Sequence, residues 1–361
     1  MKIAIVLPNG LMGGAEQFLI NIAIEYSKRG TQVSIFLLTN LGYLELFKKM
    51  KNYGIDIYTT PAKREIIGVF IFPFLIVKHY RRFDKVFTSH THINFLIGIL
   101  RFLKIVRAQL FIARESTVIF QRYSGTKLVM FKIFMKTGYL MVDYLICQTE
   151  FMRSDLLMHM PSLGKKMHIV VMHNPINVES IEYNLQFDVD LHLQAPYIVA
   201  AGSLRDEKGF DILIEAFKII SEKFPELSLV ILGSGVKFQI LQKMIHDLEL
   251  TKSVFLLGQV DNVFPYFKNA KVCVVSSRIE GFPNVLLQMM YCNSNVVSTL
   301  CADGILEIPQ ILTCEPNDIS GLAFSISKAY SSNFSTINEY HRSYLSQFHI
   351  EQFVDKINAF H

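Results

Sequence analysis

The sequence predicts an α/β protein made of two doubly wound, Rossmann-like domains. Two observations lead to this fold class. Short β-branched runs alternate with helical stretches along most of the 361 residues, which is typical of βαβ units and a parallel sheet. The alternation is interrupted once by a polar stretch and then restarts, and a chain of this length can form two domains, each with its own hydrophobic core.

Candidate strands occur in both halves of the chain. In the first half they are Lys2–Leu7, Gln32–Leu38, Ile55–Thr59, Lys85–Thr88, Gln109–Ala113, Tyr144–Cys147 and Ile169–Met172. In the second half they are Tyr197–Ala201, Leu227–Leu232, Val254–Leu257, Val272–Val275 and Asn295–Thr299. The polar stretch marks the boundary, so we place the first domain at residues 1–178, the linker at 179–195, the second domain at 196–345 and a terminal helix at 346–361.

The composition favours a cytoplasmic protein. Hydrophobic residues make up 51% of the chain, yet the longest charge-free apolar stretch, Ile66–Val77, has 12 residues and includes Pro73. A membrane-spanning helix needs about 20. Residues 1–8 lack a signal-peptide pattern and are typical of a first strand. The five cysteines include no C-x-x-C pair, which argues against a disulfide framework or a zinc site.

The two halves carry opposite charge. Residues 1–185 contain 23 Lys and Arg against 12 Asp and Glu, a net charge of +11, whereas residues 186–361 contain 13 against 19, a net charge of −6. A basic half favours contact with a polyanion or an anionic membrane. Because the sequence shows no helix-turn-helix, zinc-finger or RNP-like pattern, we expect no nucleic-acid partner.

Apolar and basic residues are mixed in three segments of the basic half. The segments are Ile66–Val77 followed by Lys78, Arg81, Arg82 and Lys85; Arg101, Lys104 and Arg107; and Lys127–Leu145. This mixture at helical spacing is what an interfacial helix needs, although core helices with solvated cationic edges would look the same. We interpret the segments as favouring peripheral association with a membrane.

The most informative stretch runs from Glu280 to Gln288 and reads EGFPNVLLQ. It follows a buried strand, and a helix is predicted to start near Asn284, a favoured N-cap residue. The first N–H groups of a helix lack partners inside it and form a site for phosphate. Glu280 and Gln288 would flank that site and could hydrogen-bond sugar hydroxyls. The alternative is an ordinary strand–loop–helix with a surface glutamate.

Two glycine-containing loops also precede predicted helices. Gly13 and Gly14 open the first helix, although they do not form a G-x-G-x-x-G dinucleotide fingerprint, which counts against a nicotinamide enzyme. In the second half, Lys208 lies in the loop before the helix at 212–224. A cation beside a helix N-terminus would stabilise the charge of a leaving diphosphate, whereas a lone loop lysine is usually solvated.

Polar residues follow two strands of the first half, at the edge where open α/β sheets bind ligands. His90 and His92 follow one strand, and a metal site there is disfavoured because no Cys or carboxylate is close in sequence. Arg114 and Glu115 follow the next strand. They could bind an acceptor or a phosphate, or form an ordinary ion pair.

The EGFPNVLLQ string resembles the Glu-x7-Glu motif of retaining, GT-B-fold glycosyltransferases of family 4, with Gln288 in place of the second Glu. Other marks of the family follow in order along nearly the whole chain. They are GGAE at 13–16, NPIN at 174–177, GSLRDEKGFD at 202–211, GSG at 233–235 and GQV at 258–260. Some members have an Arg where Ser203 stands, and Arg205 could substitute for it.

The resemblance implies two domains facing a central cleft, with the acceptor on the first, the nucleotide sugar on the second and the terminal helix crossing back onto the first. It implies catalytic roles for Glu280, His92 and Lys208. The implied donor-binding residues are Gly14, Gly202, Arg205, Lys208, Gly235, Gln259, Phe282, Asn284, Val285, Leu286 and Gln288, and the implied acceptor-binding residues are Gly13, Arg114 and Glu115.

The implied reaction moves a hexose or N-acetylhexosamine from a nucleotide sugar, with UDP expected, to a saccharide acceptor. A lipid-linked acceptor at the cytoplasmic membrane face, in surface polysaccharide synthesis, fits the basic apolar half. We expect retention at the anomeric carbon, no cofactor and no metal. Asp188-Val189-Asp190 matches D-x-D, the metal signature of another glycosyltransferase fold, but lies in the predicted linker. The alternatives are a non-catalytic sugar-nucleotide-binding partner, suggested by Gln288 and Ser203, a sugar-nucleotide epimerase and a peripheral scaffold.

Overall fold

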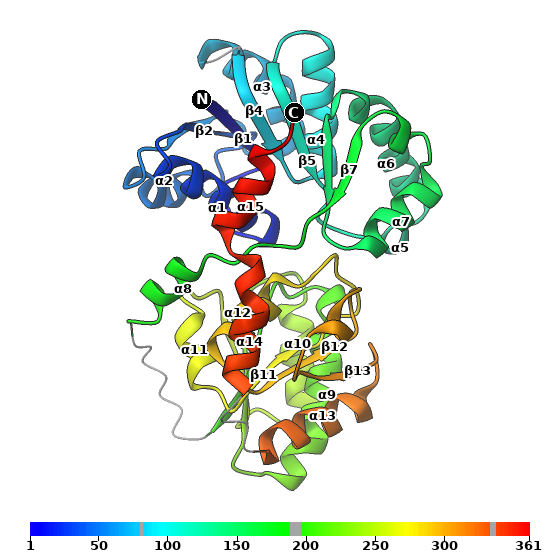
Figure 1. Ribbon diagram of the computed structural model, residues 1–361. Helices are drawn as coiled ribbons and strands as arrows, with labels where there is room; N and C mark the ends of the chain where they lie inside the picture. The colour runs from blue at the N-terminus through cyan, green and yellow to red at the C-terminus, as the bar shows by residue number, and fades with distance from the viewer. Residues whose placement is uncertain (80–81, 188–195, 333–336) are drawn as a thin grey trace. The chain divides into compact units, whose positions relative to one another are not determined.

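The computed structural model describes residues 1–79, 82–187, 196–332 and 337–361, and its chain forms two compact units (Figure 1). The first unit combines Met1–Pro175 with Ile350–His361, and the second is Ile176–His349. The first unit therefore ends slightly before the boundary predicted at residue 178. The D-x-D string at 188–190, which we do not interpret as a metal site, lies outside the described residues.

The first unit is built on a seven-stranded sheet in the order β3-β2-β1-β4-β5-β6-β7. Every neighbouring pair is parallel, as the alternation of strands and helices predicts. The strands are β1 Lys2–Leu7, β2 Gln32–Leu37, β3 Asp56–Thr59, β4 Arg82–Thr88, β5 Arg107–Arg114, β6 Tyr144–Cys147 and β7 His168–Val171. All seven candidate strands of the first half are present, with ends that differ by at most a few residues.

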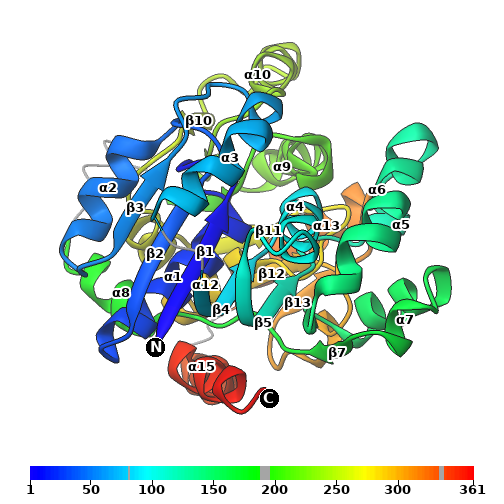
Figure 2. The same cartoon turned by 90° about the horizontal axis from the view of Figure 1, so that it is seen from above.

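Helices cover both faces of this sheet. They are α1 Gly14–Lys28, α2 Tyr43–Lys51, α3 Glu65–His79, α4 Thr91–Phe102, α5 Ile119–Arg122, α6 Gly125–Thr137, α7 Glu150–His159 and α15 Ile350–Asn358, with 3-10 turns η1 Gly138–Met141 and η2 Leu163–Lys165. Figure 2 shows α3 and α4 on one side of the strands and α15 on the other. Ile35 and Leu37 of β2 share a core with α1, α2 and α15. Phe36 points to the opposite face because side chains alternate along a strand, and it packs against Phe72 of α3.

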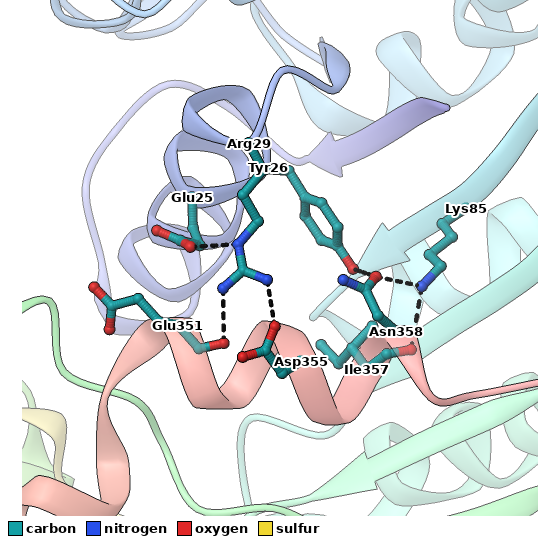
Figure 3. A network of polar contacts seen from close by, with 8 residues as sticks. All are labelled: Glu25, Tyr26, Arg29, Lys85, Glu351, Asp355, Ile357 and Asn358. Carbon is teal, nitrogen blue, oxygen red and sulfur yellow. Dashed lines mark hydrogen bonds and ion pairs between the residues drawn. The ribbon is translucent and has the colours of Figure 1, made fainter.

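The terminal helix α15 packs on the first unit, as the resemblance implies. Tyr26 Oη donates a hydrogen bond to Asn358 Oδ1 at 2.8 Å, and Lys85 Nζ donates to the same oxygen at 2.9 Å (Figure 3). Arg29 forms an ion pair with Asp355. The helix begins at Ile350, after the 3-10 turn η5 Ser346–Phe348 of the second unit, so the start predicted at residue 346 is four residues early.

The second unit has a six-stranded parallel sheet in the order β10-β9-β8-β11-β12-β13. The strands are β8 Tyr197–Ala201, β9 Ser228–Leu232, β10 Val254–Gly258, β11 Val272–Val275, β12 Val296–Thr299 and β13 Leu312–Cys314. β13 is absent from the predicted strands. It is a three-residue edge strand whose residues are only half-buried, so it lacks the apolar run that marks the other strands.

Helices also cover the second sheet. They are α8 Val178–Asn184, α9 Phe210–Lys223, α10 Phe238–Asp247, α11 Phe264–Asn269, α12 Asn284–Cys292, α13 Ile319–Ser331 and α14 Ile337–Leu345, with 3-10 turns η3 Asp206–Lys208 and η4 Ile305–Glu307. The prediction of an irregular linker from residue 179 is wrong at its start. Asn177 caps α8 by accepting a hydrogen bond from the Ser180 amide at 2.9 Å, so this segment is helical and belongs to the second unit.

Within the described residues, no helix is long and apolar enough to cross a membrane. In the same part of the chain, no group of three or more His, Cys, Asp or Glu side chains is placed to hold a metal ion.

Candidate functional site

The candidate site of the second unit is formed by loops at the carboxyl ends of parallel strands. The loop between β11 and α12 carries Glu280. It is held in place by the backbone amide of Glu280, which donates to the Cys301 carbonyl at 2.8 Å, and by Thr299 Oγ1, which donates to the Ser277 carbonyl at 2.5 Å. The neighbouring strand β12 therefore determines where the Glu280 carboxylate lies.

Lys208 and Glu280, two of the predicted catalytic residues, form an ion pair. Ser277 Oγ also donates to the Glu280 carboxylate, at 3.0 Å, and Ser276 Oγ donates to the Lys208 carbonyl at 2.9 Å. Both charged side chains are mostly but not fully shielded from solvent. The tertiary structure therefore brings together two residues that the sequence places 72 positions apart.

Gly209 explains why the Lys208 loop passes so close to β11. It has a positive φ of 61°, and a Cβ built on it would lie 2.1 Å from the Ser276 carbonyl oxygen. A side chain at this position would be strained in φ and would clash with backbone. Glycine is therefore required for Lys208 to approach the loop that carries Glu280.

Arg278 and Asp211 are site-supporting residues that the sequence analysis did not single out. The two Arg278 guanidinium NH groups donate to the two Asp211 carboxylate oxygens at 2.8 and 2.6 Å, and one of them also donates to the Asp206 carbonyl at 2.6 Å. Burial raises the pKa of Asp211, but the Arg278 hydrogen bonds outweigh it and lower that pKa. The bidentate pair clamps the Lys208 loop onto the Glu280 loop. The signal available in the sequence was the Asp that ends the GSLRDEKGFD string.

The loops after β8 and β9 are packed backbone to backbone. A Cβ on Gly233 would lie 1.9 Å from the Gly202 carbonyl oxygen, and a Cβ on Gly235 would lie 2.5 Å from the Leu204 carbonyl oxygen. A Cβ on Gly202 would meet the Lys208 side chain at 3.5 Å. Three of the family's glycine positions therefore gather around the Lys208 loop, where a side chain would push the loops apart.

Gln259 and Arg205 lie at the same edge of the sheet. Gln259 follows β10, and its Oε1 is 3.5 Å from Ser234 Oγ in the loop after β9. Arg205 is exposed, and its carbonyl accepts a hydrogen bond from the Lys208 amide at 3.1 Å. Both predicted donor-binding side chains are therefore accessible to a ligand.

The start of α12 differs from the prediction. Asn284 is the first helical residue and not the N-cap, a position that Pro283 occupies with an extended backbone. The Leu286 amide donates to the Pro283 carbonyl at 3.0 Å, so this predicted phosphate contact already has a partner in the helix. Val285 is half-buried, and Gln288 lies one turn further along, also half-buried.

The predicted donor contacts of Phe282 and Leu286 cannot involve their side chains. Both side chains are buried in the core between the second sheet and α12, together with Ile305 and Met290. A side-chain contact of either residue with the donor is therefore not supported by the structure.

In the first unit, the structure places the two glycines and the two histidines at the carboxyl edge of the sheet. Gly13 is the N-cap residue of α1, and Gly14 is its first helical residue. His90 is the N-cap residue of α4, and His92 is the second residue of that helix.

Each histidine faces a carboxylate from a distant segment. His90 Nε2 is 3.0 Å from Glu16 Oε1, and His92 Nε2 is 3.4 Å from Glu65 Oε2. The contact with His92 lowers the pKa of Glu65 against the effect of burial. The sequence analysis found no carboxylate near the histidines because Glu16 and Glu65 approach them only through the fold.

Arg114 and Glu115 do not lie on an exposed edge, contrary to the expectation that they contact an acceptor. Each is only 3% exposed. Arg114 donates to Ser89 Oγ at 2.9 Å and to Asn174, and Glu115 accepts from Tyr139. No ion pair joins Arg114 to Glu115 in the described part of the chain, so the simple ion-pair alternative is wrong, whereas acceptor binding by these residues stays a prediction that their burial disfavours.

Burial dominates the titration of this pair. It raises the pKa of Glu115 to about 7 and lowers the pKa of Arg114 to about 9, because a charged group loses hydration inside the protein. Asn174, the first residue of the NPIN string, also donates to Gln148 Oε1 at 2.6 Å. These residues form a buried polar network that ties β5 to the end of the first unit.

Comparisons with known proteins concern the family and the fold. Residues 184–357 match the model of the glycosyl transferases group 1 family, and residues 12–180 match that of glycosyltransferase family 4. A glycosyltransferase of Methanocaldococcus jannaschii is 33% identical over 195 residues, which cover 52% of this chain and 46% of that relative. The chain therefore spans less than half of that relative.

Two further likenesses extend over more of the chain. A Campylobacter jejuni enzyme, N-acetylgalactosamine-N,N'-diacetylbacillosaminyl-diphospho-undecaprenol 4-alpha-N-acetylgalactosaminyltransferase, is 27% identical over 255 residues, covering 69% of this chain and 67% of that protein. The crystal structure of Anabaena HepE in complex with UDP and glucose superposes with a TM-score of 0.79 at 17% identity, covering 99% of both chains. At 17% identity, the likeness to HepE shows the fold alone.

Proposed function

We propose that this chain, which belongs to the group 1 glycosyltransferases with the GT-B fold, transfers a hexose or N-acetylhexosamine from a UDP-sugar to a saccharide acceptor. The observation that carries the proposal is the contact of Lys208 with Glu280 at the carboxyl edge of the second sheet. It combines a cation suited to a diphosphate with a carboxylate suited to sugar hydroxyls.

The donor diphosphate would bind beside Lys208 and the first turn of α12. A lysine ammonium has three N–H donors, so Lys208 can hold a phosphate oxygen while it remains bonded to Glu280. Glu280 would then orient the hexose through its second carboxylate oxygen. Gln288 would hold the ribose, because an amide both donates to and accepts from a hydroxyl.

The transfer would retain the anomeric configuration and need no metal. Lys208, the exposed Arg205 and the N-terminus of α12 can together counter the charge that builds on the leaving nucleoside diphosphate. The leaving phosphate would take the acceptor proton. His92, held by Glu65 at the edge of the first sheet, would contact the donor hexose.

The acceptor would be a lipid-linked saccharide, with the enzyme attached peripherally to the inner face of the cell membrane during surface polysaccharide synthesis. The name of the Campylobacter relative describes transfer to a saccharide on diphospho-undecaprenol, which supports this choice of acceptor. The basic charge of the first half is also suited to an anionic surface.

The first experiment is thermal denaturation of the purified chain with UDP, GDP and ADP, each with and without EDTA. A ligand at about 100 times its dissociation constant stabilises the folded state by about 2.7 kcal/mol, which shifts the midpoint by a few degrees. We expect a shift with UDP that EDTA leaves unchanged and that Lys208→Ala weakens. Lys243→Ala is the matched control, because Lys243 is an exposed lysine of the same unit paired with Asp247. No shift with any nucleotide would contradict the proposal.

The anomer of the product then tests the stereochemistry. Nuclear magnetic resonance of the transferred sugar should show the donor configuration, and an inverted anomer would exclude retention.

The second candidate function is that of a non-catalytic protein that binds nucleotide sugar. Gln288 favours this function because it replaces a charged residue of the family motif. UDP binding without turnover on any saccharide acceptor would favour that function.

A further inference from the structure

Helix α3 is apolar on its buried side. Gly68, Phe72 and Ile76 recur every fourth residue and are all buried. A Cβ on Gly68 would lie 2.0 Å from the Leu38 carbonyl oxygen, so this glycine allows the helix to lie directly on the loop after β2. Phe72 packs edge-on against Phe36 at 6.4 Å between ring centroids.

The opposite side of α3 is apolar as well, although it is exposed. Ile66, Phe70 and Phe74 also recur every fourth residue, and they are 70%, 74% and 77% exposed. A helix on the surface of a protein in water normally presents polar residues outward, and contiguous exposed apolar side chains mark an interaction site. We call these three residues the α3 face.

Basic residues flank the α3 face at both ends. Lys63 and Arg64 precede the helix, Lys78 lies in its last turn, and all three are exposed. No charged residue interrupts the stretch from Ile66 to Val77. Glu65 is the one acidic residue beside them, so the α3 face is an apolar strip with a net positive charge at both ends.

This combination matches an anionic lipid surface better than a second copy of the chain. Phenylalanines can enter the boundary between headgroups and acyl chains while lysines bind anionic headgroups. In a two-fold symmetric dimer the same patch would face itself, so Lys63, Arg64 and Lys78 would approach one another, with Glu65 as the single carboxylate of the helix to offset them. Charge complementarity thus favours the membrane.

We propose that the α3 face is the surface by which this protein docks on membranes containing anionic lipids. The inference rests on the proposed function insofar as a lipid-linked acceptor requires the enzyme to reach a membrane. It goes further by assigning the docking surface to one helix of the first unit.

The α3 face starts next to a predicted site residue. Glu65, the first residue of α3, contacts His92, and Ile66 follows it directly. The N-terminal end of the α3 face therefore lies at the same edge of the first sheet as His92. This position suits delivery of an acceptor whose lipid part stays in the membrane.

The test is co-sedimentation of the full chain with vesicles of phosphatidylcholine alone and of phosphatidylcholine mixed with phosphatidylglycerol. We expect binding to the mixed vesicles, and we expect Phe70→Ser with Phe74→Ser to weaken it by about tenfold for each phenylalanine, because each aromatic ring loses its burial in lipid. Phe324→Ser is the matched control, since Phe324 is a 68% exposed phenylalanine on α13 of the second unit. It should leave binding unchanged.

A second variant tests the basic residues at the two ends of the α3 face. Replacing Lys63 and Lys78 by Gln should weaken binding to the mixed vesicles by about fivefold per lysine, and added salt should reduce the difference from the parent chain. Equal binding of the parent to both vesicle types would overturn the role of charge. Unchanged binding of the double serine variant, with circular dichroism equal to that of the parent, would overturn the α3 face itself.

Two further measurements separate this inference from its alternatives and from the proposed function. Sedimentation velocity would reveal a dimer that the double serine variant dissociates, and such a dimer without vesicle binding would assign the face to a second copy. Transfer to a water-soluble acceptor should be the same in the parent and the double serine variant. Vesicle binding without any transfer would refute the proposed function alone, and transfer without vesicle binding would refute only the docking surface.

Discussion

The predicted site residues of the two units differ in their exposure to solvent. In the second unit, Lys208 and Glu280 meet at a partly accessible edge, supported by serines, glycines and the Arg278–Asp211 clamp. In the first unit, Arg114 and Glu115 are buried in a polar network. Both pairs follow strands at the ligand-binding edge of a parallel sheet. Position at that edge therefore does not by itself decide whether a side chain is accessible to a ligand.

The second unit should show the largest effects on activity. Because Lys208 and Glu280 would face charge that develops during transfer, replacing either by Ala should lower kcat by about a hundredfold to a thousandfold, with the fold retained. Steady-state transfer assays and circular dichroism measure both. Lys243→Ala should leave kcat and the circular dichroism spectrum unchanged in the same assays. Full activity in Glu280→Ala would contradict the prediction that the second unit carries the residues on which transfer depends.

The buried polar network of the first unit should instead affect the pH dependence of the free energy of unfolding. The pKa of Glu115 is about 7 in the folded chain, above its usual value of 4.5, so the folded state prefers the protonated form. The free energy of unfolding should therefore fall as pH rises from about 4.5 to about 7, by about 3 kcal/mol, and level off above that range. Denaturation by urea across this range measures the slope.

Glu115→Gln is the matched variant for this measurement. Because it cannot ionise, most of the slope should disappear, and the variant should approach or exceed the parent in stability at pH 8. A parent slope of the opposite sign would mean that Glu115 is charged inside the network. A selective increase in the acceptor KM would restore the acceptor role that burial argues against.

Buried and exposed contacts of the terminal helix should differ by a smaller amount. Asn358→Ala removes the acceptor shared by Tyr26 and the buried Lys85, and should lower the free energy of unfolding by about 2 kcal/mol. Asp355→Ala removes the ion pair with Arg29. Because the Asp355 carboxylate is largely exposed, this change should lower the free energy of unfolding by less than about 1 kcal/mol. Equal losses would show that burial does not decide the strength of these contacts.

A comparably small effect is expected at Gln288. Gln288→Glu would replace a neutral hydrogen bond to a ribose hydroxyl by a charge-assisted one, which should tighten UDP binding by about fivefold. Isothermal titration calorimetry measures this change, with Gln259→Glu as a comparison in the neighbouring loop. Weaker binding in Gln288→Glu would indicate that the residue faces the diphosphate and not the ribose.

Much of the fold was predictable from local patterns. The predicted strands of both sheets are present because buried parallel strands form continuous apolar runs, which are visible in a single sequence. The loops with Lys208 and Glu280 were predictable because their glycines and apolar neighbours form recognisable strings. The short edge strand β13 and the helix α8 were missed because neither has a long apolar run.

Only the tertiary structure decided which residues meet and which are buried. Glu16 and Glu65 reach the two histidines from other segments, and Arg278 reaches Asp211 across 67 positions of the chain. Arg114 and Glu115 are buried by side chains that come from distant elements. A sequence determines local periodicity and therefore the strands and helices. Burial and pairing depend on which strand ends the parallel sheet brings to one edge, and that is a property of the folded chain.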